Sequence, residues 1–335
     1  MRAITRRDVL KGLAAILLAG LAVAIYPFVE VFGRPRITRY AITPRNWTPG
    51  LTLRVAVIAD LHASEPWMST ARIEGICADT QALGADLILL LGDYVKAMGR
   101  AADDIPASDW ASALARLTAP LGVHAILGNH DYWEDQRFQR GETTEPIALE
   151  ALRNTGIPTY RNQSIRLEKD GHAFWLAGLD DQLALLPGTR YGRDHMAGLD
   201  DLAATLTQVT DAAPVLLMAH EPDAFAFGGV PDRVSLTLSG HTHGGQISIF
   251  GWRPWAASRG SRRYPAGYYN VDGRELIVSR GLGCSVVPIR FGNWPEIVLI
   301  ELGAEKSAID APGVSSKGPL PAGCAAGLSP EGEPD

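Results

Sequence analysis

From about residue 51 onward, short and nearly continuous apolar runs alternate with amphipathic stretches. A continuous apolar run bounded by turn residues is typical of a strand covered on both faces, and apolar positions at helical spacing predict helices. Repeated alternation of strand and helix predicts an α/β fold. The predicted strands are 53–59, 86–91, 122–127, 164–168, 173–177, 214–219 and 234–239, and the predicted helices are 71–83, 109–117, 147–152 and 199–209.

Three later apolar runs, 246–250, 275–279 and 296–301, are predicted to be antiparallel strands that close a second sheet. The two ends of the chain differ from this pattern. We therefore divide the chain into a signal or membrane anchor at 1–30, a linker and lead-in at 31–50, a catalytic domain at 51–302 and a disordered tail at 303–335.

The N-terminus joins basic residues to the uncharged stretch 13–29. Residues 5–11, with Arg6 and Arg7, resemble a twin-arginine export signal, which implies the twin-arginine machinery as a partner; an ordinary signal or signal anchor is the alternative. Residues 22–24 have the form of a cleavage site, but the apolar run continues beyond them, and we favour a retained membrane anchor. The positive flank then leaves the N-terminus in the cytoplasm and the domain outside it.

The composition of the chain limits the kinds of partner and metal site that we expect for the protein. Lys and Arg number 31 against 37 Asp and Glu, a net charge of -6, and no long basic run could follow a nucleic-acid backbone, so we expect no nucleic-acid partner. The three cysteines have no paired spacing and predict neither a disulfide framework nor a zinc-thiolate site. We expect a monomer.

Five polar motifs each follow an apolar run, so side chains from five strand ends are expected to meet at one edge of a sheet. A pair of divalent cations requires anionic oxygen and imidazole ligands, and these motifs supply both. Each motif alone also fits an ordinary polar turn; their number and order favour metal binding. The motifs are Asp60-Leu61-His62, Gly92-Asp93, Gly128-Asn129-His130-Asp131, His220 and Gly240-His241-Thr242-His243. The other histidines, His124, His172 and His195, lie outside such motifs and are expected to be structural or surface residues.

In these motifs the chain resembles the calcineurin-like metallophosphoesterases. The resemblance spans residues 55–246 and implies a four-layer α/β-β/α sandwich of two mixed sheets flanked by helices. It also implies two divalent metal ions, manganese foremost, with zinc or iron as alternatives. By position in the motifs, the first metal would be held by Asp60, His62 and His243, Asp93 would bridge the two, and the second would be held by Asn129, His220 and His241.

The same resemblance implies that His130 faces the phosphate, where it stabilises charge or protonates the leaving oxygen, and that Asp131 orients its imidazole. The nucleophile would be a metal-bound hydroxide.

Residues 244–246, 281–283 and 290–296 resemble the exported or membrane-anchored branch that includes UDP-2,3-diacylglucosamine hydrolase-like proteins. That likeness implies a phosphodiester or pyrophosphate substrate from a lipid or envelope precursor. A phosphomonoesterase or nucleotidase is the alternative. A catalytically inactive scaffold is a third reading, although scaffolds of this type usually lose ligands and none is missing here.

An aromatic and arginine-rich segment follows the last motif. Its Arg259, Arg262 and Arg263 are candidates to grip a phosphate, and in an anchored protein the segment could rest on lipid headgroups; a solvated loop with aromatics packed beneath it is the alternative. Asp180 and Asp181, after a predicted strand, are further candidates for substrate contact.

Overall fold

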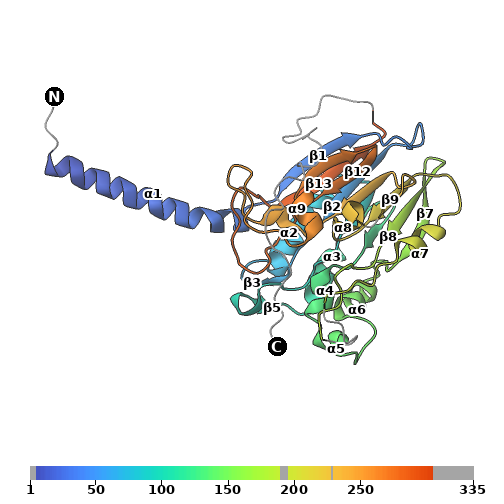
Figure 1. Ribbon diagram of the computed structural model, residues 1–335, viewed down its shortest axis with the longest axis horizontal. Coiled ribbons are helices and arrows are strands. Elements are labelled where there is room, and N and C mark those ends of the chain that lie inside the picture. The colour runs from blue at the N-terminus through green and yellow to red at the C-terminus, as the bar shows by residue number, and fades with distance from the viewer. Residues whose placement is uncertain (1–4, 189–194, 228, 305–335) are drawn as a thin grey trace, which may run out of the picture.

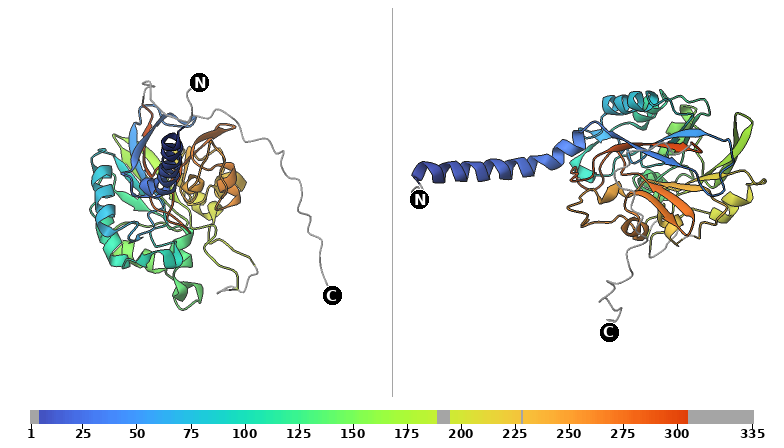
Figure 2. Two further views of the ribbon diagram at one scale, coloured as in Figure 1. Left: turned by 90° about the vertical axis from the view of Figure 1, so that its left-hand side faces the viewer. Right: turned by 90° about the horizontal axis from the view of Figure 1, so that it is seen from above.

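Two mixed sheets lie face to face in the computed structural model, which describes residues 5–188, 195–227 and 229–304 (Figure 1). Nearly all of the predicted tail at 303–335 lies outside the described residues, as does the start of the predicted signal. The helix α1 projects away from the sheets, with its first residues farthest from them (Figures 1 and 2).

The first sheet carries three of the motifs. Its central strands β2, β4 and β6 run parallel, so their carboxyl ends meet at one edge, while β13 is antiparallel to β2 and pairs in parallel with β1. In sheet order the strands are β1 (Arg36–Ile42), β13 (Glu296–Leu302), β2 (Leu53–Ile58), β4 (Leu87–Leu90) and β6 (Val123–Ala125).

The second sheet carries the other two motifs, at the ends of the parallel strands β9 and β10. Strands β8 and β12 extend the parallel core on either side, and β7 and β11 add antiparallel edges. In sheet order the strands are β11 (Gly267–Val271), β12 (Arg274–Val278), β10 (Leu236–Ser239), β9 (Val215–Met218), β8 (His172–Gly178) and β7 (Gln163–Lys169). A small ribbon joins β3 (Ser64–Glu65) to β5 (Asp103–Asp104).

Helices cover the outer faces of both sheets (Figure 1). The α-helices are α1 (Arg6–Phe32), α2 (Thr70–Gln81), α3 (Ala107–Leu114), α4 (Asn129–Trp133), α5 (Gln136–Gln139), α6 (Ile147–Asn154), α7 (Leu202–Thr207), α8 (Asp223–Phe227) and α9 (Arg259–Arg263), with 3₁₀ turns at Gly99–Ala101 and His243–Gly245.

Three apolar layers hold this arrangement together. Between the sheets, residues such as Val55 and Val57 of β2 pack in one cluster with Leu216 and Leu236 of the second sheet. Outside the first sheet, α2, α3 and α6 bury side chains such as Trp110, and outside the second sheet α7 and α8 complete a smaller cluster. The predicted four-layer α/β-β/α sandwich is therefore confirmed.

Some of the predicted elements were wrong in detail. Residues 246–250 form only isolated bridges, because this segment pairs with the loop at Phe291 instead of with a sheet. Strand β13 belongs to the first sheet, and β12 is parallel to β10 although antiparallel to β11. The lead-in at 31–50 contains β1, an edge strand of the first sheet in which most residues are only partly buried or exposed.

The inner end of α1 also departs from the expectation that residues 1–30 stay outside the fold. Glu30 and Val31 are buried, and the Glu30 carboxylate accepts hydrogen bonds from the backbone N–H groups of Gly292 (2.9 Å) and Asn293 (3.1 Å). A buried carboxylate is tolerated when such donors satisfy it. The helix is therefore joined to the domain at its last turn.

Candidate metal centre

The five motifs sit at the facing strand ends of the two sheets, and most of their side chains leave from strained backbone. A residue with a Cβ adopts positive φ at a cost and is usually held there by surrounding contacts, often at a functional site. Positive φ occurs at Asp60 (55°), His62 (50°), Asp93 (59°), His241 (65°) and His243 (49°). Five of the seven predicted ligands thus use this conformation.

Glycines let the ligand loops approach closely. A Cβ on Gly128 would collide with the Asp93 carboxylate and the His220 imidazole. A Cβ on Gly281, which has φ +65°, would lie 2.6 Å from Oδ2 of Asp60. Side chains at these positions would push ligands out of place.

A first cluster contains Asp60, His62, Asp93 and His243, whose ligand atoms all lie within 4.8 Å of one another. His62 Nε2 is 3.1 Å from His243 Nε2 and 3.5 Å from Asp93 Oδ2. His62 Nδ1 lies 2.9 Å from the carbonyl oxygen of Val95, so Nδ1–H donates there and the lone pair on Nε2 faces the cluster.

A second cluster shares Asp93 with the first and adds His220 and His241. His220 Nε2 is 3.3 Å from Asp93 Oδ2, and its Nδ1–H donates to the carbonyl oxygen of Leu91 (2.6 Å). Asn129 joins this cluster, with its Oδ1 2.8 Å from His241 Nδ1. Asp93 therefore stands where a bridging carboxylate is expected.

Several buried polar atoms in the two clusters have no hydrogen-bond partner among the described residues: Asp60 Oδ2, His220 Nε2 and His241 Nε2. Each such atom costs about 1–3 kcal/mol if it stays unsatisfied. Two divalent cations sharing Asp93 would satisfy them with the carboxylate and imidazole ligands that such ions take. The residues present thus fit the metal pair that the motifs predicted.

The electrostatics of three of the four predicted histidine ligands agree with this fit. Burial lowers the pKa of His62 to about 4 and that of His241 to about 3, and it holds the pKa of His243 well below its ordinary value. These imidazoles are neutral at pH 7, which is the form that binds metal. Burial raises the pKa of Asp60 to about 7, and a nearby cation would favour its ionised form.

His130 lies beside both clusters without belonging to either. Its backbone N–H donates to Asp93 Oδ1 (2.9 Å), and its ring meets that of His62 edge to face at 5.1 Å. Its Nδ1 is 3.4 Å from Oε1 of Glu134, and its Nε2 is 3.4 Å from Oγ of Ser285. Burial opposes the charged ring, but the Asp93 and Glu134 carboxylates raise the pKa of His130 above its ordinary value.

Asp131 makes contacts that the resemblance did not imply. Its carboxylate accepts hydrogen bonds from the backbone N–H groups of Gly128, Asp93 and Tyr94, each 2.9 Å long. It thereby joins two ligand loops, and the group beside the His130 imidazole is Glu134 instead. The orienting role of Asp131 towards His130 stays a prediction; for its contacts with the two loops, an acid three residues after the cap of a short helix was the overlooked signal.

The two candidate substrate aspartates are buried. Asp180 accepts hydrogen bonds from the Tyr132 hydroxyl and from Arg161 Nε (2.9 Å), and its contact with a substrate stays a prediction. Asp181 lies with His220 and Glu221 in a third group within 4.8 Å, behind the second cluster. Sequence reasoning missed Glu221, although it directly follows a predicted ligand.

The three candidate arginines all belong to α9 and are exposed. Arg259 stacks on the Phe227 ring at 4.7 Å and Arg263 on the Tyr264 ring at 5.4 Å, while Arg262 lines a surface pocket with Arg253. Their contact with a substrate stays a prediction.

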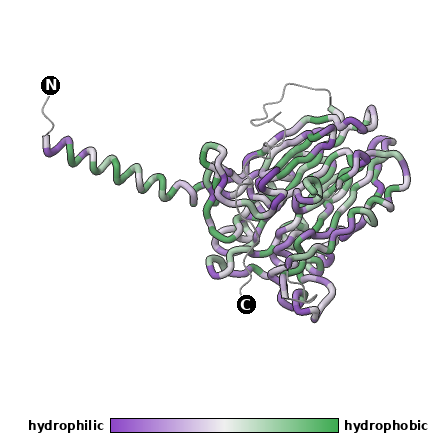
Figure 3. Tube along the Cα trace, viewed as in Figure 1, coloured by the Kyte–Doolittle hydropathy of each residue, from purple (hydrophilic) through white to green (hydrophobic). Residues whose placement is uncertain are grey.

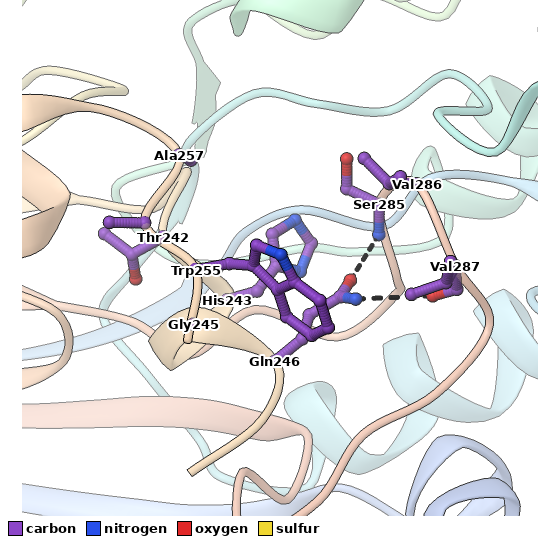
Figure 4. Close-up of a pocket in the computed structure, with 10 residues that line it drawn as sticks. Thr242, His243, Gly245, Gln246, Trp255, Ala257, Ser285, Val286 and Val287 are labelled. Carbon is purple, nitrogen blue, oxygen red and sulfur yellow. Dashed lines mark hydrogen bonds between the residues drawn. The ribbon is translucent and has the colours of Figure 1, made fainter. Parts of the chain in front are cut away.

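Two contacts near His243 had no sequence signal. Arg290 is fully buried, donates to the carbonyl oxygens of Gly283 and Arg280, and lies 3.1 Å from His243 Nδ1. Gln246 accepts from the Ser285 N–H and donates to the Val287 carbonyl oxygen (Figure 4).

Beside these residues, a pocket of about 320 Å³ is lined by His243, Trp255, Ser285 and Val287 among others. A space thus opens next to a predicted metal ligand, between the loops that follow β10 and β12.

Fold and site together define a metal-dependent phosphoester hydrolase. Residues 53–245 match the calcineurin-like phosphoesterase family, and the chain belongs to that family. It is 28% identical over 313 residues to the uncharacterized metallophosphoesterase YkuE of Bacillus subtilis, covering 90% of this chain and 99% of that protein. It is 31% identical over 256 residues to the phosphodiesterase YaeI of Escherichia coli, covering 74% and 82%. A Danio rerio transmembrane protein with metallophosphoesterase domain is 29% identical over 302 residues, covering 87% of this chain and 62% of that protein.

Proposed function

We propose that this enzyme is a membrane-anchored phosphodiesterase that acts outside the cytoplasm on a phosphodiester or pyrophosphate of a lipid or envelope precursor, as UDP-2,3-diacylglucosamine hydrolase-like enzymes do. The observation that carries the proposal is the pair of buried ligand clusters sharing Asp93, with His130 beside both.

The chemistry follows from these groups. Two divalent cations, manganese foremost, would neutralise the phosphate oxygens and lower the pKa of a bound water. The neutral imidazoles of His62, His241 and His243, together with the Asp93 carboxylate that both clusters share, would hold the ions. His130, with its raised pKa, donates a proton to the leaving oxygen, and Glu134 holds its ring.

Three observations support the proposed membrane anchoring and the proposed phosphodiester substrate. The helix α1 is long and apolar enough to cross a membrane. One similar protein is named a transmembrane protein and another a phosphodiesterase. The pocket beside His243 has apolar walls at Trp255 and Val287, which suit an acyl chain. Export of the folded domain through the twin-arginine route, signalled by Arg6 and Arg7, belongs to the same proposal.

The test is a substrate screen with the purified full chain, loaded with Mn²⁺ in detergent. Bis-p-nitrophenyl phosphate, nucleotides and UDP-linked lipids are offered, and products are identified by mass. We expect a phosphomonoester product from a diester or pyrophosphate. Orthophosphate released from monoesters at a higher kcat/KM would overturn the proposal in favour of a phosphomonoesterase.

A further inference from the structure

Exposed apolar side chains gather on two loops beside the inner end of α1. Phe250 is fully exposed, Val286 is 74% exposed, and Trp252 and Trp255 are more than half exposed. Figure 3 shows that α1 is mostly hydrophobic and that further hydrophobic stretches lie in the loops beside its inner end. Contiguous exposed apolar surface usually marks a contact site. We call this surface the apolar rim and define it as Ile249, Phe250, Trp252, Trp255, Val286 and Val287.

Hydrogen bonds join the two loops of the apolar rim into one surface. The backbone N–H of Ser248 donates to the Phe291 carbonyl oxygen (2.7 Å), and the Phe291 N–H donates to that of Gln246 (2.9 Å). The rim residues on either side of the pocket at His243 are therefore held in a fixed relation to each other.

The same surface is attached to α1. The Arg290 N–H donates to the Pro27 carbonyl oxygen (3.1 Å), and the rings of Tyr26 and Phe291 meet edge to face at 5.3 Å. Glu30 accepts from two more backbone N–H groups of this loop. These contacts fix the position of the apolar rim relative to the last turn of α1.

The length of the uncharged part of α1 determines how deep the last turn of α1 lies in a bilayer. Between Lys11 and Glu30 the helix has no charged residue. This uncharged stretch is about 27 Å long at 1.5 Å per residue, close to the roughly 30 Å of a hydrocarbon core. Glu30 then marks the outer boundary of the core. Val286 is four residues from Arg290, so it lies within about 15 Å of Arg290, whose N–H is 3.1 Å from the Pro27 carbonyl oxygen. A bilayer crossed by α1 is therefore within reach of the rim.

Charge favours an anionic surface. Residues 234–271 contain Arg253, Arg259, Arg262 and Arg263 but no acidic residue. A basic segment beside a membrane helix is attracted to anionic lipids by about 1 kcal/mol per residue. Aromatic rings with exposed edges, such as Trp252 and Trp255, favour the headgroup level.

We propose that the apolar rim rests on the anionic outer surface of the bilayer that α1 crosses, so that the pocket beside His243 opens towards lipid headgroups. This inference relies on the membrane anchoring in the proposed function. It adds a second membrane contact, made by the catalytic domain itself, and it gives the site access to a substrate that stays in the bilayer.

Tryptophan fluorescence of the full chain in vesicles tests the contact. The chain is reconstituted into phosphatidylcholine vesicles containing one third phosphatidylglycerol, with or without bromine on the acyl chains, which quenches nearby indoles. We expect the variant Trp252→Phe/Trp255→Phe to lose at least half of the quenching seen in the unaltered chain. The matched control Trp175→Phe, in β8 of the second sheet, should lose none.

The outcomes separate this inference from the proposed function. A chain that does not float with the vesicles refutes the anchoring and the rim contact together. A chain that floats, but in which the double variant keeps the full quenching, refutes the rim contact alone. Equal quenching of the rim tryptophans in pure phosphatidylcholine refutes the role of anionic lipid. None of these outcomes depends on finding the substrate.

Discussion

The apolar rim and the strand ends that carry the seven predicted metal ligands, which we call the ligand edge, both depart from the usual distribution of side chains, in opposite ways. At the ligand edge, Asp60 and His62 are completely buried. On the rim, Phe250 and Val286 are among the most exposed apolar residues described. Buried polar atoms without partners and exposed apolar groups both cost free energy unless something else binds them. The difference between the two regions therefore indicates two kinds of partner, a cation pair and an apolar surface.

The strongest test of the ligand edge is removal of the metal. Chelation should reduce turnover at least about a thousand-fold, because the ions supply several kcal/mol of charge stabilisation. Added Mn²⁺ should restore activity best, with zinc or iron as alternatives, and should raise the Tm, because the ions bind the folded state. Activity and Tm are measured on the same samples. Activity that survives complete metal removal would contradict a two-metal site.

The second-largest loss of turnover is expected for His130→Ala. A general acid contributes about a hundred- to ten-thousand-fold, so turnover should fall by that factor while two metals per chain remain bound. Metal content, measured by mass spectrometry, distinguishes a catalytic role of His130 from a role as a metal ligand. The control His195→Ala, at an exposed position outside the motifs, should change neither quantity. Loss of the metals in the His130 variant would mean that the residue belongs to the ligand set.

Variants of Asp131 and Glu134 separate an effect on stability from an effect on turnover within the ligand edge. Asp131→Ala removes an acceptor from buried N–H groups of two loops and should lower the free energy of unfolding by about 3 kcal/mol or more. Glu134→Gln keeps the fold, because Glu134 is partly exposed, and should lower turnover only several-fold. Chemical denaturation and kcat are compared for both. If Asp131→Ala kept full stability and lost only turnover, the role implied by the resemblance would be supported.

Sequence patterns predicted the ligand edge well because its signals are local. Each motif directly follows a short, largely apolar run, and such runs do form β2, β4, β6, β9 and β10. Parallel pairing brings the motifs of each sheet to one edge, but the five motifs belong to two sheets and not to one as expected, so their meeting also depends on how the sheets pack. The structure brings Asp93 into both clusters, a position that a bridging ligand requires.

Long-range contacts explain what the pattern could not predict. Strand β1 looked like a linker because its partner is β13, which lies at the other end of the domain in sequence. Residues 246–250 have strand-like composition, but their partner is the irregular loop at Phe291. The buried position of Arg290 depends on carbonyl groups of Arg280 and Gly283, earlier in the same irregular loop, which no spacing reveals.

The rim is tested last, through the residue that joins it to α1, and here the expected effect is smallest. If residues 1–30 only target the protein, Glu30→Ala should have no effect on the folded domain. The structure predicts a loss of about 2 kcal/mol in the free energy of unfolding, because a buried carboxylate accepts two backbone hydrogen bonds and hydrogen bonds to charged groups are the stronger ones. Glu145→Ala, which breaks only a partly exposed pair with Arg153, should cost less than about 1 kcal/mol. Denaturation of both variants in detergent gives the comparison. Equal stability of the two would mean that α1 is not joined to the domain, and the rim would then have no fixed position relative to the membrane.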